Sequence, residues 1–198
     1  DLPQRLRVDA DAFAAELAFA RQQGYRHVVL LGHSTGCQKI TYHAARRRDP
    51  LVKGLILAAL GDDLAIAQRD LGRTYPTWLA KARDLVARGK GDTKLPPKCL
   101  GFTARRFLSA VDPTQTEARL FHLAGPMTTF RRVTLPILAV FPENEQYACI
   151  PVHEAAAILQ AKTRSRAFTR AIIPDADHSF HGQESTCAET CLRWIAGL

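Results

Sequence analysis

A short apolar segment that ends in a glycine–serine–glycine turn constrains this chain more than any other feature. Val28–Leu31 is wholly apolar and stops at Gly32; Ser34 follows, then Gly36, and a helical pattern begins. This is the G-x-S-x-G pattern in the context strand, turn, helix, which lifts a serine hydroxyl clear of the strand end. Because such a turn is crowded, we expect a side chain at Gly32 or Gly36 to clash with the backbone.

The turn predicts a nucleophile and part of the site that would serve it. Ser34 is the candidate nucleophile, and Thr35 directly follows it at the start of the predicted helix. The N-terminus of a helix presents backbone N–H groups and a partial positive charge. We therefore expect the Thr35 N–H to stabilise an oxyanion that develops during attack by Ser34.

Length, charge and cysteine content narrow the class of protein. The 198 residues suffice for one domain with a core. Arginines that give the net charge of +8 are scattered, apart from Arg46–Arg48 at a predicted helix end, so we expect no nucleic-acid partner. No apolar run approaches the roughly 20 residues that span a bilayer. Five cysteines without a regular framework favour free thiols in a reducing compartment, hence a cytoplasmic protein without a metal site.

The alternation of elements predicts an α/β fold with a parallel sheet. We expect strands at 26–31, 52–59, 135–141 and 167–173, and helices at 9–23, 36–47, 152–161 and before the C-terminus. Strands separated by helices of this length form parallel sheets with right-handed crossovers. Because the first two strands are apolar without alternation, we expect helices on both faces of the sheet.

The middle of the chain has no strand pattern. Residues 61–133 are predicted to form short helices at 63–71, 76–88, 103–110 and 113–124, separated by loops that contain glycine and proline. An excursion of this length between two strands is typical of a helical cap over a pocket. We therefore expect a core formed by residues 1–61 and 134–198 and a cap insertion at residues 62–133.

Histidines in the predicted loops are the candidates for a general base. Functional groups gather at the carboxyl ends of parallel strands, and His178 follows the last strand. A serine needs such a base, so we expect His178 to activate Ser34, with His181 as the second candidate. His33 lies inside the turn, and we expect its side chain to leave Ser34 in a different direction. The remaining histidines indicate nothing beyond surface or core roles; they are His27, His43, His122 and His153.

Three carboxylates compete for the acid that would orient His178. Glu145 lies in the loop after the third strand, with Glu143 two residues before it. Asp62 follows the second strand, which is the other place where such a sheet can hold an acid. The order serine, acid, histidine is satisfied by each of them. Asp62 also stands where a helix N-cap is expected, and capping explains it equally well.

Several segments resemble the α/β-hydrolase superfamily over nearly the whole chain. The narrower resemblance is to a mainly fungal and eukaryotic subgroup with the elbow GHSTGCQ, which is Gly32–Gln38 in this sequence. Further matches are Gly54–Leu57 with Asp62 following, Ala82–Val86 leading into Gly89–Asp92, Ala104–Ser109 and Ala176–Ser179.

The resemblance implies roles for three residues and a substrate class. It implies Ser34 as nucleophile, His178 as base and an acid at Glu145, where the subgroup usually has Asp. Siderophore-ester hydrolysis is associated with this siderophore-esterase-like subgroup. We therefore expect a serine hydrolase that cleaves a small-molecule carboxylic ester through an acyl-enzyme and needs no cofactor. An acyltransferase would use the same residues, and a non-catalytic hydrolase-like binding protein is the alternative from another class.

One part of the family pattern has no counterpart. In this fold the first strands, and the loop that carries the second oxyanion amide, precede the helix that begins here near Asp9. We interpret the chain as a fragment, or as a chain that needs these first strands and their loop for activity. The strand at Val28 is then expected at an unpaired edge of the sheet. No oligomeric state is indicated.

Overall fold

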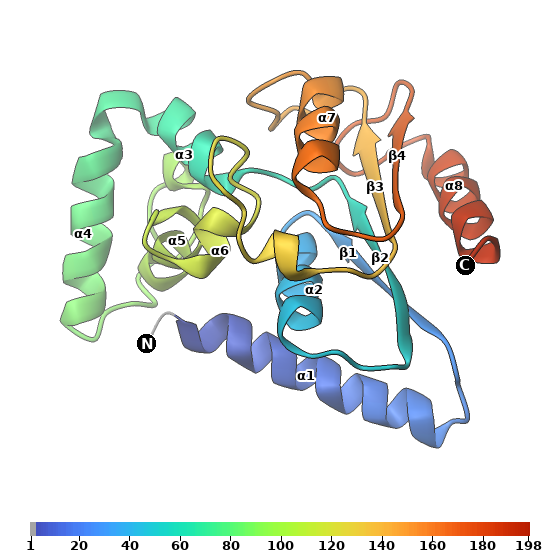
Figure 1. Ribbon diagram of the computed structural model, residues 1–198. Helices are drawn as coiled ribbons and strands as arrows, with labels where there is room; N and C mark the ends of the chain where they lie inside the picture. The colour runs from blue at the N-terminus through green and yellow to red at the C-terminus, as the bar shows by residue number, and fades with distance from the viewer. Residues whose placement is uncertain (1–2) are drawn as a thin grey trace.

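Four parallel strands form the centre of the fold (Figure 1). A computed structural model describes residues 3–198, and the side chains from residue 12 onward. The strands are β1 (Val28–His33), β2 (Val52–Ala58), β3 (Ile137–Pro142) and β4 (Phe168–Ile173), and their order in the sheet is β1-β2-β3-β4. The parallel sheet is confirmed, and β1 lies at its edge as expected. The carboxyl ends of all four strands meet at one side of the molecule.

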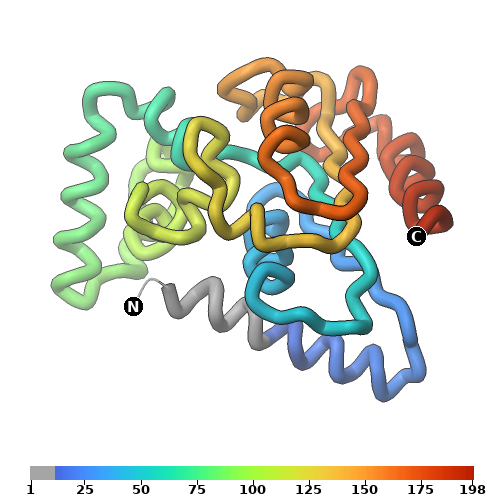
Figure 2. The backbone as a smooth tube through the Cα atoms, in the orientation of Figure 1, coloured from blue at the N-terminus to red at the C-terminus, as the bar shows by residue number. Residues whose placement is uncertain are grey.

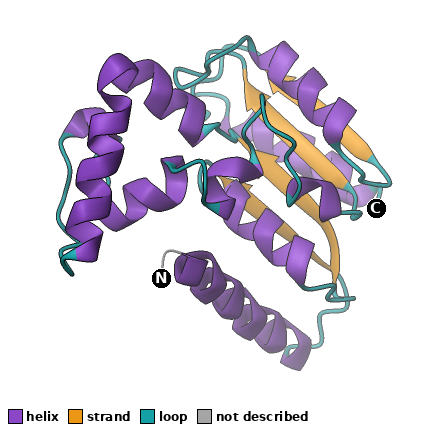
Figure 3. Cartoon of the chain, turned by 60° about the vertical axis from the view of Figure 1, so that its left-hand side comes forward, coloured by secondary structure: helices purple, strands orange, loops and turns teal. Residues whose placement is uncertain are grey.

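Three helices cover one face of the sheet. They are α1 (Pro3–Gln22), α2 (Gly36–Arg46) and α7 (Val152–Lys162). Side chains of all three join one buried cluster with alternate residues of the strands; the cluster includes Leu17, Ile40, Leu57, Ala139 and Leu159. Helices α2 and α7 contact the strands directly, whereas α1 packs mainly on α2 (Figure 3). The apolar character of the strands therefore does produce a buried face.

The opposite face is covered only in part by the described residues. Helix α8 (Glu184–Ala196) packs on β3 and β4 and is the one helix of residues 12–198 in the buried cluster on that face. Leu31 on β1 points to this face and is 57% exposed. The expectation of helices on both faces is right for β2 and wrong for β1, because α8 does not reach the edge strand.

The chain between β2 and β3 leaves the sheet and returns to it (Figure 2). It forms α3 (Asp63–Leu71), η1 (Gly72–Thr74), α4 (Tyr75–Ala87), η2 (Pro97–Cys99), α5 (Ala104–Val111), α6 (Thr116–Leu120) and η3 (Phe130–Arg132). The helices α3, α4 and α5 bury a separate apolar cluster of their own, which includes Ala67, Leu79 and Phe107. We call the segment 62–133 the cap segment. Its separate cluster is compatible with the predicted division of the chain, which stays a prediction.

Helix α6 is much shorter than the helix expected at 113–124. The Asp112 carboxylate accepts hydrogen bonds from the N–H and the hydroxyl of Thr114, which holds the chain in a turn before the helix. At the other end, the Leu123 N–H donates to the side chain of Asp62 instead of continuing the helix. Helical spacing in the sequence therefore predicted an end for this helix that is too late, because the hydrogen-bond partner of Leu123 lies far away in sequence.

The described residues hold no helix that is both long and apolar enough to cross a membrane. The longest, α1, has 20 residues and mixes charged and apolar side chains.

Candidate active site

The turn after β1 holds Ser34 in a conformation that L-residues seldom adopt. Its φ is 54°, in the left-handed region, and its N–H donates to Ala58 O at 2.9 Å. The Cys37 N–H donates to Ser34 O at 3.0 Å, which closes the turn into α2. A strained backbone at a strand-to-helix turn is typical of a functional position. The strained turn expected at Ser34 is present, and its role as a nucleophile elbow stays a prediction.

The two glycines of the turn differ in what they require. A Cβ on Gly32 would lie 2.6 Å from the carbonyl carbon and oxygen of Gly36, so no side chain fits there. A Cβ on Gly36 would meet no described atom within 4 Å. The expected clash is confirmed at Gly32 and wrong at Gly36. Gly36 is the first residue of α2, and the position of its Cβ faces open space.

Cys37 supports the turn from below. Its side chain is fully buried, and the thiol donates to Gly32 O at 3.1 Å and to Ala58 O at 3.3 Å. Burial raises the pKa of the Cys37 thiol far above its ordinary value. Since only a thiolate is a good nucleophile, Cys37 is a structural residue that ties the elbow to β2.

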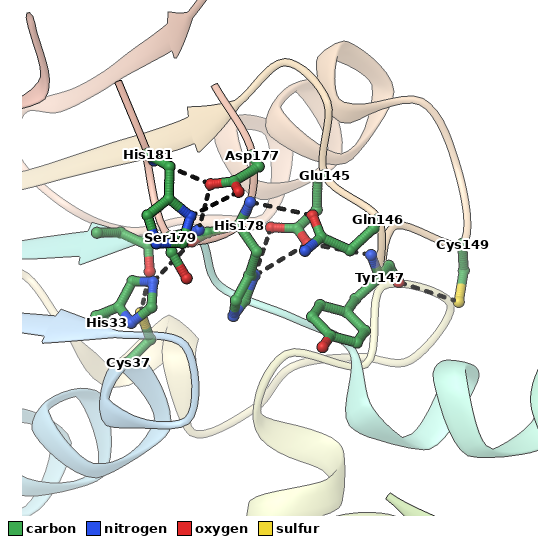
Figure 4. Close-up of polar contacts among 11 residues, drawn as sticks. His33, Cys37, Glu145, Gln146, Tyr147, Cys149, Asp177, His178, Ser179 and His181 are labelled. Atoms are coloured by element: carbon green, nitrogen blue, oxygen red, sulfur yellow. Dashed lines mark hydrogen bonds and ion pairs between the residues drawn. The ribbon is translucent and has the colours of Figure 1, made fainter. Parts of the chain in front are cut away.

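His178 lies in the loop after β4 and is paired with Glu145 from the loop after β3 (Figure 4). Its Nδ1 lies 2.8 Å from Glu145 Oε2 and 2.9 Å from Oε1, and both side chains are largely buried. The carboxylate can only accept, so Nδ1 carries the proton and Nε2 is left for another partner. Within the described residues, no hydrogen bond joins Nε2 to Ser34; such contacts are often long before substrate binds.

Three neighbours hold His178 in place, two at its backbone and one at its ring. Gln146 Oε1 accepts from the His178 N–H at 3.1 Å, and His33 Nε2 donates to His178 O at 2.8 Å. The ring of Tyr147 stands nearly perpendicular to the His178 ring at 4.8 Å between centroids (Figure 4). Through His33, the residue before the candidate nucleophile, the histidine loop is joined to the elbow. This role of His33 had no sequence signal.

Two alternative candidates face elsewhere. Glu143 Oε2 accepts from the Asp175 N–H at 3.0 Å and makes no hydrogen bond to an imidazole among the described residues. His181 is 74% exposed, and its Nδ1 lies 2.8 Å from Asp177 Oδ2. This hydrogen bond raises the pKa of His181 and lowers that of Asp177. Neither Glu143 nor His181 lines the cavity described below, so the geometry favours neither as acid or base.

Asp62 is engaged by residues of the cap segment. It caps α3, since Oδ1 accepts from the Ala65 N–H at 3.0 Å, and Oδ2 accepts from the Leu123 N–H at 2.9 Å. Its third partner is His122, whose Nδ1 lies 3.1 Å from Oδ2. The capping role considered from sequence is present. As the acid of a site, Asp62 is paired with His122 and not with His178.

The two histidine–carboxylate pairs and Ser34 line one cavity of about 880 Å³. Its polar lining includes Ser34, Thr35, Asp62, Asp63, His122, Glu145 and His178. Burial raises the pKa of Asp63 to about 7. The rest of the wall is mostly apolar, with Leu60, Ile66, Phe102, Phe141 and Ile158 among its members. A largely apolar cavity of this size with a few convergent polar groups is typical of a small-molecule site.

The sequence profile of a family described as "Protein of unknown function (DUF1749)" matches residues 6–195. No curated protein matches the sequence.

Solved structures show the fold. The chain is similar to a thermostable carboxyl esterase from Bacillus coagulans in complex with glycerol, with a TM-score of 0.65 and 14% identity, over 97% of this chain and 71% of that one. It is similar to an α/β-hydrolase from the sediment metagenome of a Moroccan lagoon, with a TM-score of 0.52 and 15% identity, over 95% and 70%. A monoacylglycerol lipase from Paleococcus ferrophilus has a TM-score of 0.51 and 18% identity, over 86% and 66%. The chain therefore has a partial α/β-hydrolase fold.

Proposed function

We propose that this chain, which belongs to the DUF1749 family and has a partial α/β-hydrolase fold, is a serine hydrolase that cleaves carboxylic esters through an acyl-enzyme. The observation that carries the proposal is the His178–Glu145 pair at 2.8 Å, which lines the same cavity as a strained Ser34. Serine alone is a poor nucleophile, and a base oriented by a carboxylate is what activates it.

In the proposed reaction each residue has one task. Ser34 Oγ attacks the ester carbonyl carbon while His178 Nε2 takes its proton, and the resulting oxyanion accepts from the Thr35 N–H. The imidazolium then donates that proton to the leaving alcohol. Water then attacks the acyl carbonyl carbon while His178 Nε2 takes a proton from it, and the imidazolium returns that proton to Ser34 Oγ as the carboxylic acid leaves. Glu145 holds the ring and stabilises its positive charge.

The cavity supports a small-molecule ester as substrate. Its volume of about 880 Å³ and its apolar wall suit an acyl or alcohol group of moderate length. A carboxyl esterase and a monoacylglycerol lipase are among the proteins of similar fold. The resemblance of the elbow Gly32–Gln38 to a fungal siderophore-esterase-like subgroup makes siderophore esters one class to test. We propose a cytoplasmic location on the basis of the five free cysteines.

Labelling by a fluorophosphonate probe tests the proposal directly. We expect covalent labelling of the folded protein, loss of labelling in Ser34→Ala, and strongly reduced labelling in His178→Ala. Cys149→Ala serves as control for attack by the thiol in the cavity wall and should still be labelled. A folded protein that the probe never labels, or labelling that survives Ser34→Ala, would contradict the proposal.

A further inference from the structure

A second histidine lines the cavity and has no part in the proposed hydrolysis. The side chain of His122 is 23% exposed, and its Nδ1 lies 3.1 and 3.2 Å from the two oxygens of Asp62. Both residues belong to the cavity wall, together with Ser34 and His178. The cavity therefore contains one imidazole–carboxylate pair more than the acyl-enzyme mechanism requires.

The surroundings of Asp62 determine which nitrogen of His122 carries the proton. Each carboxylate oxygen already accepts a backbone N–H, one from Ala65 and one from Leu123. The carboxylate thus meets Nδ1 as an acceptor, and Nδ1 carries the ring proton. In the neutral ring, Nε2 is then a hydrogen-bond acceptor. No hydrogen bond to His122 Nε2 is present within the described residues, and His122 is one of the residues that line the cavity.

The loop that carries His122 is held rigidly. The Lys162 ammonium on α7 donates to Leu123 O at 2.5 Å and to Gly125 O at 2.6 Å. A Cβ on Gly125 would lie 3.0 Å from His122 Cδ2, so the loop packs closely against the ring. A ring fixed by a carboxylate and by its loop loses little freedom when it binds a ligand. Such preorganisation is what a specificity site needs.

The charges around the cavity indicate what kind of group His122 would bind. No lysine or arginine is among the described residues of the wall, although the chain carries a net charge of +8. An anionic group would therefore find no cation there. Three of the four carboxylates in the described wall are already partnered: Asp62 and Glu145 by histidines, and Asp70 by Arg69 at 2.7 Å. The fourth is Asp63, whose pKa burial raises to about 7, so it carries less charge at neutral pH than an ordinary carboxylate. An ammonium group would find no free and fully ionised carboxylate among these four, which favours an uncharged donor.

We propose that His122 Nε2 accepts a hydrogen bond from a hydroxyl group of the substrate, so that the pocket selects hydroxylated esters. The inference rests on the proposed esterase function and names the substrate class of that same site. A hydroxyl fits because it is uncharged and donates one proton. An ester without it would leave a polar atom facing an apolar group, which costs affinity.

Two pairs of esters test the selection. One pair differs on the acyl side (4-nitrophenyl octanoate and 4-nitrophenyl 3-hydroxyoctanoate). The other differs on the alcohol side (propyl octanoate and glycerol 1-octanoate). We expect kcat/KM to favour the hydroxylated member about ten-fold in one pair, as for an uncharged hydrogen bond, and the pair that responds identifies the side that His122 contacts.

The variant His122→Phe keeps a ring and removes the acceptor. In the pair of esters that responds, we expect the ratio of kcat/KM between the hydroxylated and the plain ester to fall to about one in this variant. His153→Phe on the exposed side of α7 is the matched control and should keep the wild-type ratio. If His122→Phe does not fold, His122→Ala carries the same expectation. A hydroxyl preference that persists without His122, or no preference in either pair, would overturn the inference.

A binding measurement separates this inference from the proposed function. In the Ser34→Ala background, calorimetry should show tighter binding of the hydroxylated ester, and adding His122→Phe should remove the difference. Turnover without a hydroxyl preference would refute only the inference. Selective binding by a protein that neither hydrolyses esters nor reacts with a fluorophosphonate would refute only the proposed function. Equal binding of both esters overturns the inference whatever the turnover.

Discussion

Two imidazole–carboxylate pairs line one cavity, and they differ in their other hydrogen-bond partners. His178 and Glu145 approach to 2.8 Å, and the imidazole loop is joined to the elbow through His33. His122 and Asp62 approach to 3.1 Å, and Asp62 also caps α3 and anchors the loop at residues 121–125. The first pair lies on loops of the sheet; the second lies in the cap segment.

The comparison teaches that such a pair does not define a role by itself. A carboxylate beside an imidazole sets the tautomer in both cases, and the remaining nitrogen then acts on whatever lies next to it. For His178 the candidate partner is Ser34, and for His122 it is the substrate. The same local chemistry is thus proposed to serve catalysis in one place and selection in the other.

The largest expected difference concerns the two imidazoles. We expect His178→Ala to lower kcat for a 4-nitrophenyl ester by about 10³-fold or more, because Ser34 loses its base. His122→Ala should change it by less than about ten-fold, because a plain ester makes no hydrogen bond to His122. His181→Ala, an exposed histidine three residues from His178, is the control and should keep wild-type kcat. Equal losses at the two imidazoles would erase the proposed distinction.

Substitutions of Glu145 and Asp62 should affect different properties, activity for Glu145 and stability for Asp62. Glu145→Gln is expected to lower kcat by about 10²- to 10⁴-fold, because the tautomer and the charge of His178 are no longer supported. Glu143→Gln makes the same change two residues earlier and should leave kcat within about two-fold. Asp62→Asn should mainly reduce the free energy of unfolding, by about 1–2 kcal/mol, because a backbone N–H loses its acceptor. Steady-state kinetics and urea unfolding measure both; a full loss of kcat in Glu143→Gln would reverse the assignment.

Asp63 lies in the same cavity wall and links the two pairs electrostatically. Burial raises its pKa from 3.8 to about 7; Arg106 and His178 lower it, and Glu117 and Asp62 raise it further. The folded protein then binds the proton more tightly than the unfolded chain, so this group makes stability fall as pH rises from about 4 to about 7. Above pH 7 the loss is complete.

Asp63→Asn should remove that pH dependence. Relative to wild type, we expect a gain in the free energy of unfolding of up to about 4 kcal/mol at pH 8 and none near pH 4. Urea unfolding of both proteins at the two pH values measures the difference. A gain that is the same at pH 4 and pH 8 would show that Asp63 does not titrate in this range.

The smallest expected effect concerns the loop at residues 121–125, which carries His122. Lys162→Met removes a charged donor from Leu123 O and Gly125 O, and we expect a loss of about 1–2 kcal/mol in the free energy of unfolding. The apolar stem of the residue is kept, so packing should change little. Because the loop carries His122, selection between hydroxylated and plain esters should weaken, while fluorophosphonate labelling of Ser34 should persist. If this variant selects between the esters as well as the wild type does, the hydrogen bonds from Lys162 are not needed to position His122.

Local patterns in the sequence predicted the arrangement on which the site depends. The apolar strand, the spacing of Gly32 and Ser34 and the helix that follows are short-range features, because sterics within a few residues determine such a turn. The strands were predicted to within a few residues, and parallel strands place the loops with Glu145 and His178 at one edge. These are consequences of periodicity and topology, which a single sequence carries.

Only the tertiary structure decided which groups face each other. Glu143 and Glu145 are two residues apart, yet only Glu145 meets His178, because the Asp175 N–H takes the other carboxylate. The end of α6 and the position of His122 depend on Asp62, which lies 60 residues before that histidine in sequence. Hydrogen bonds over such separations leave no periodic trace, since they form between loops whose relative placement is determined by packing.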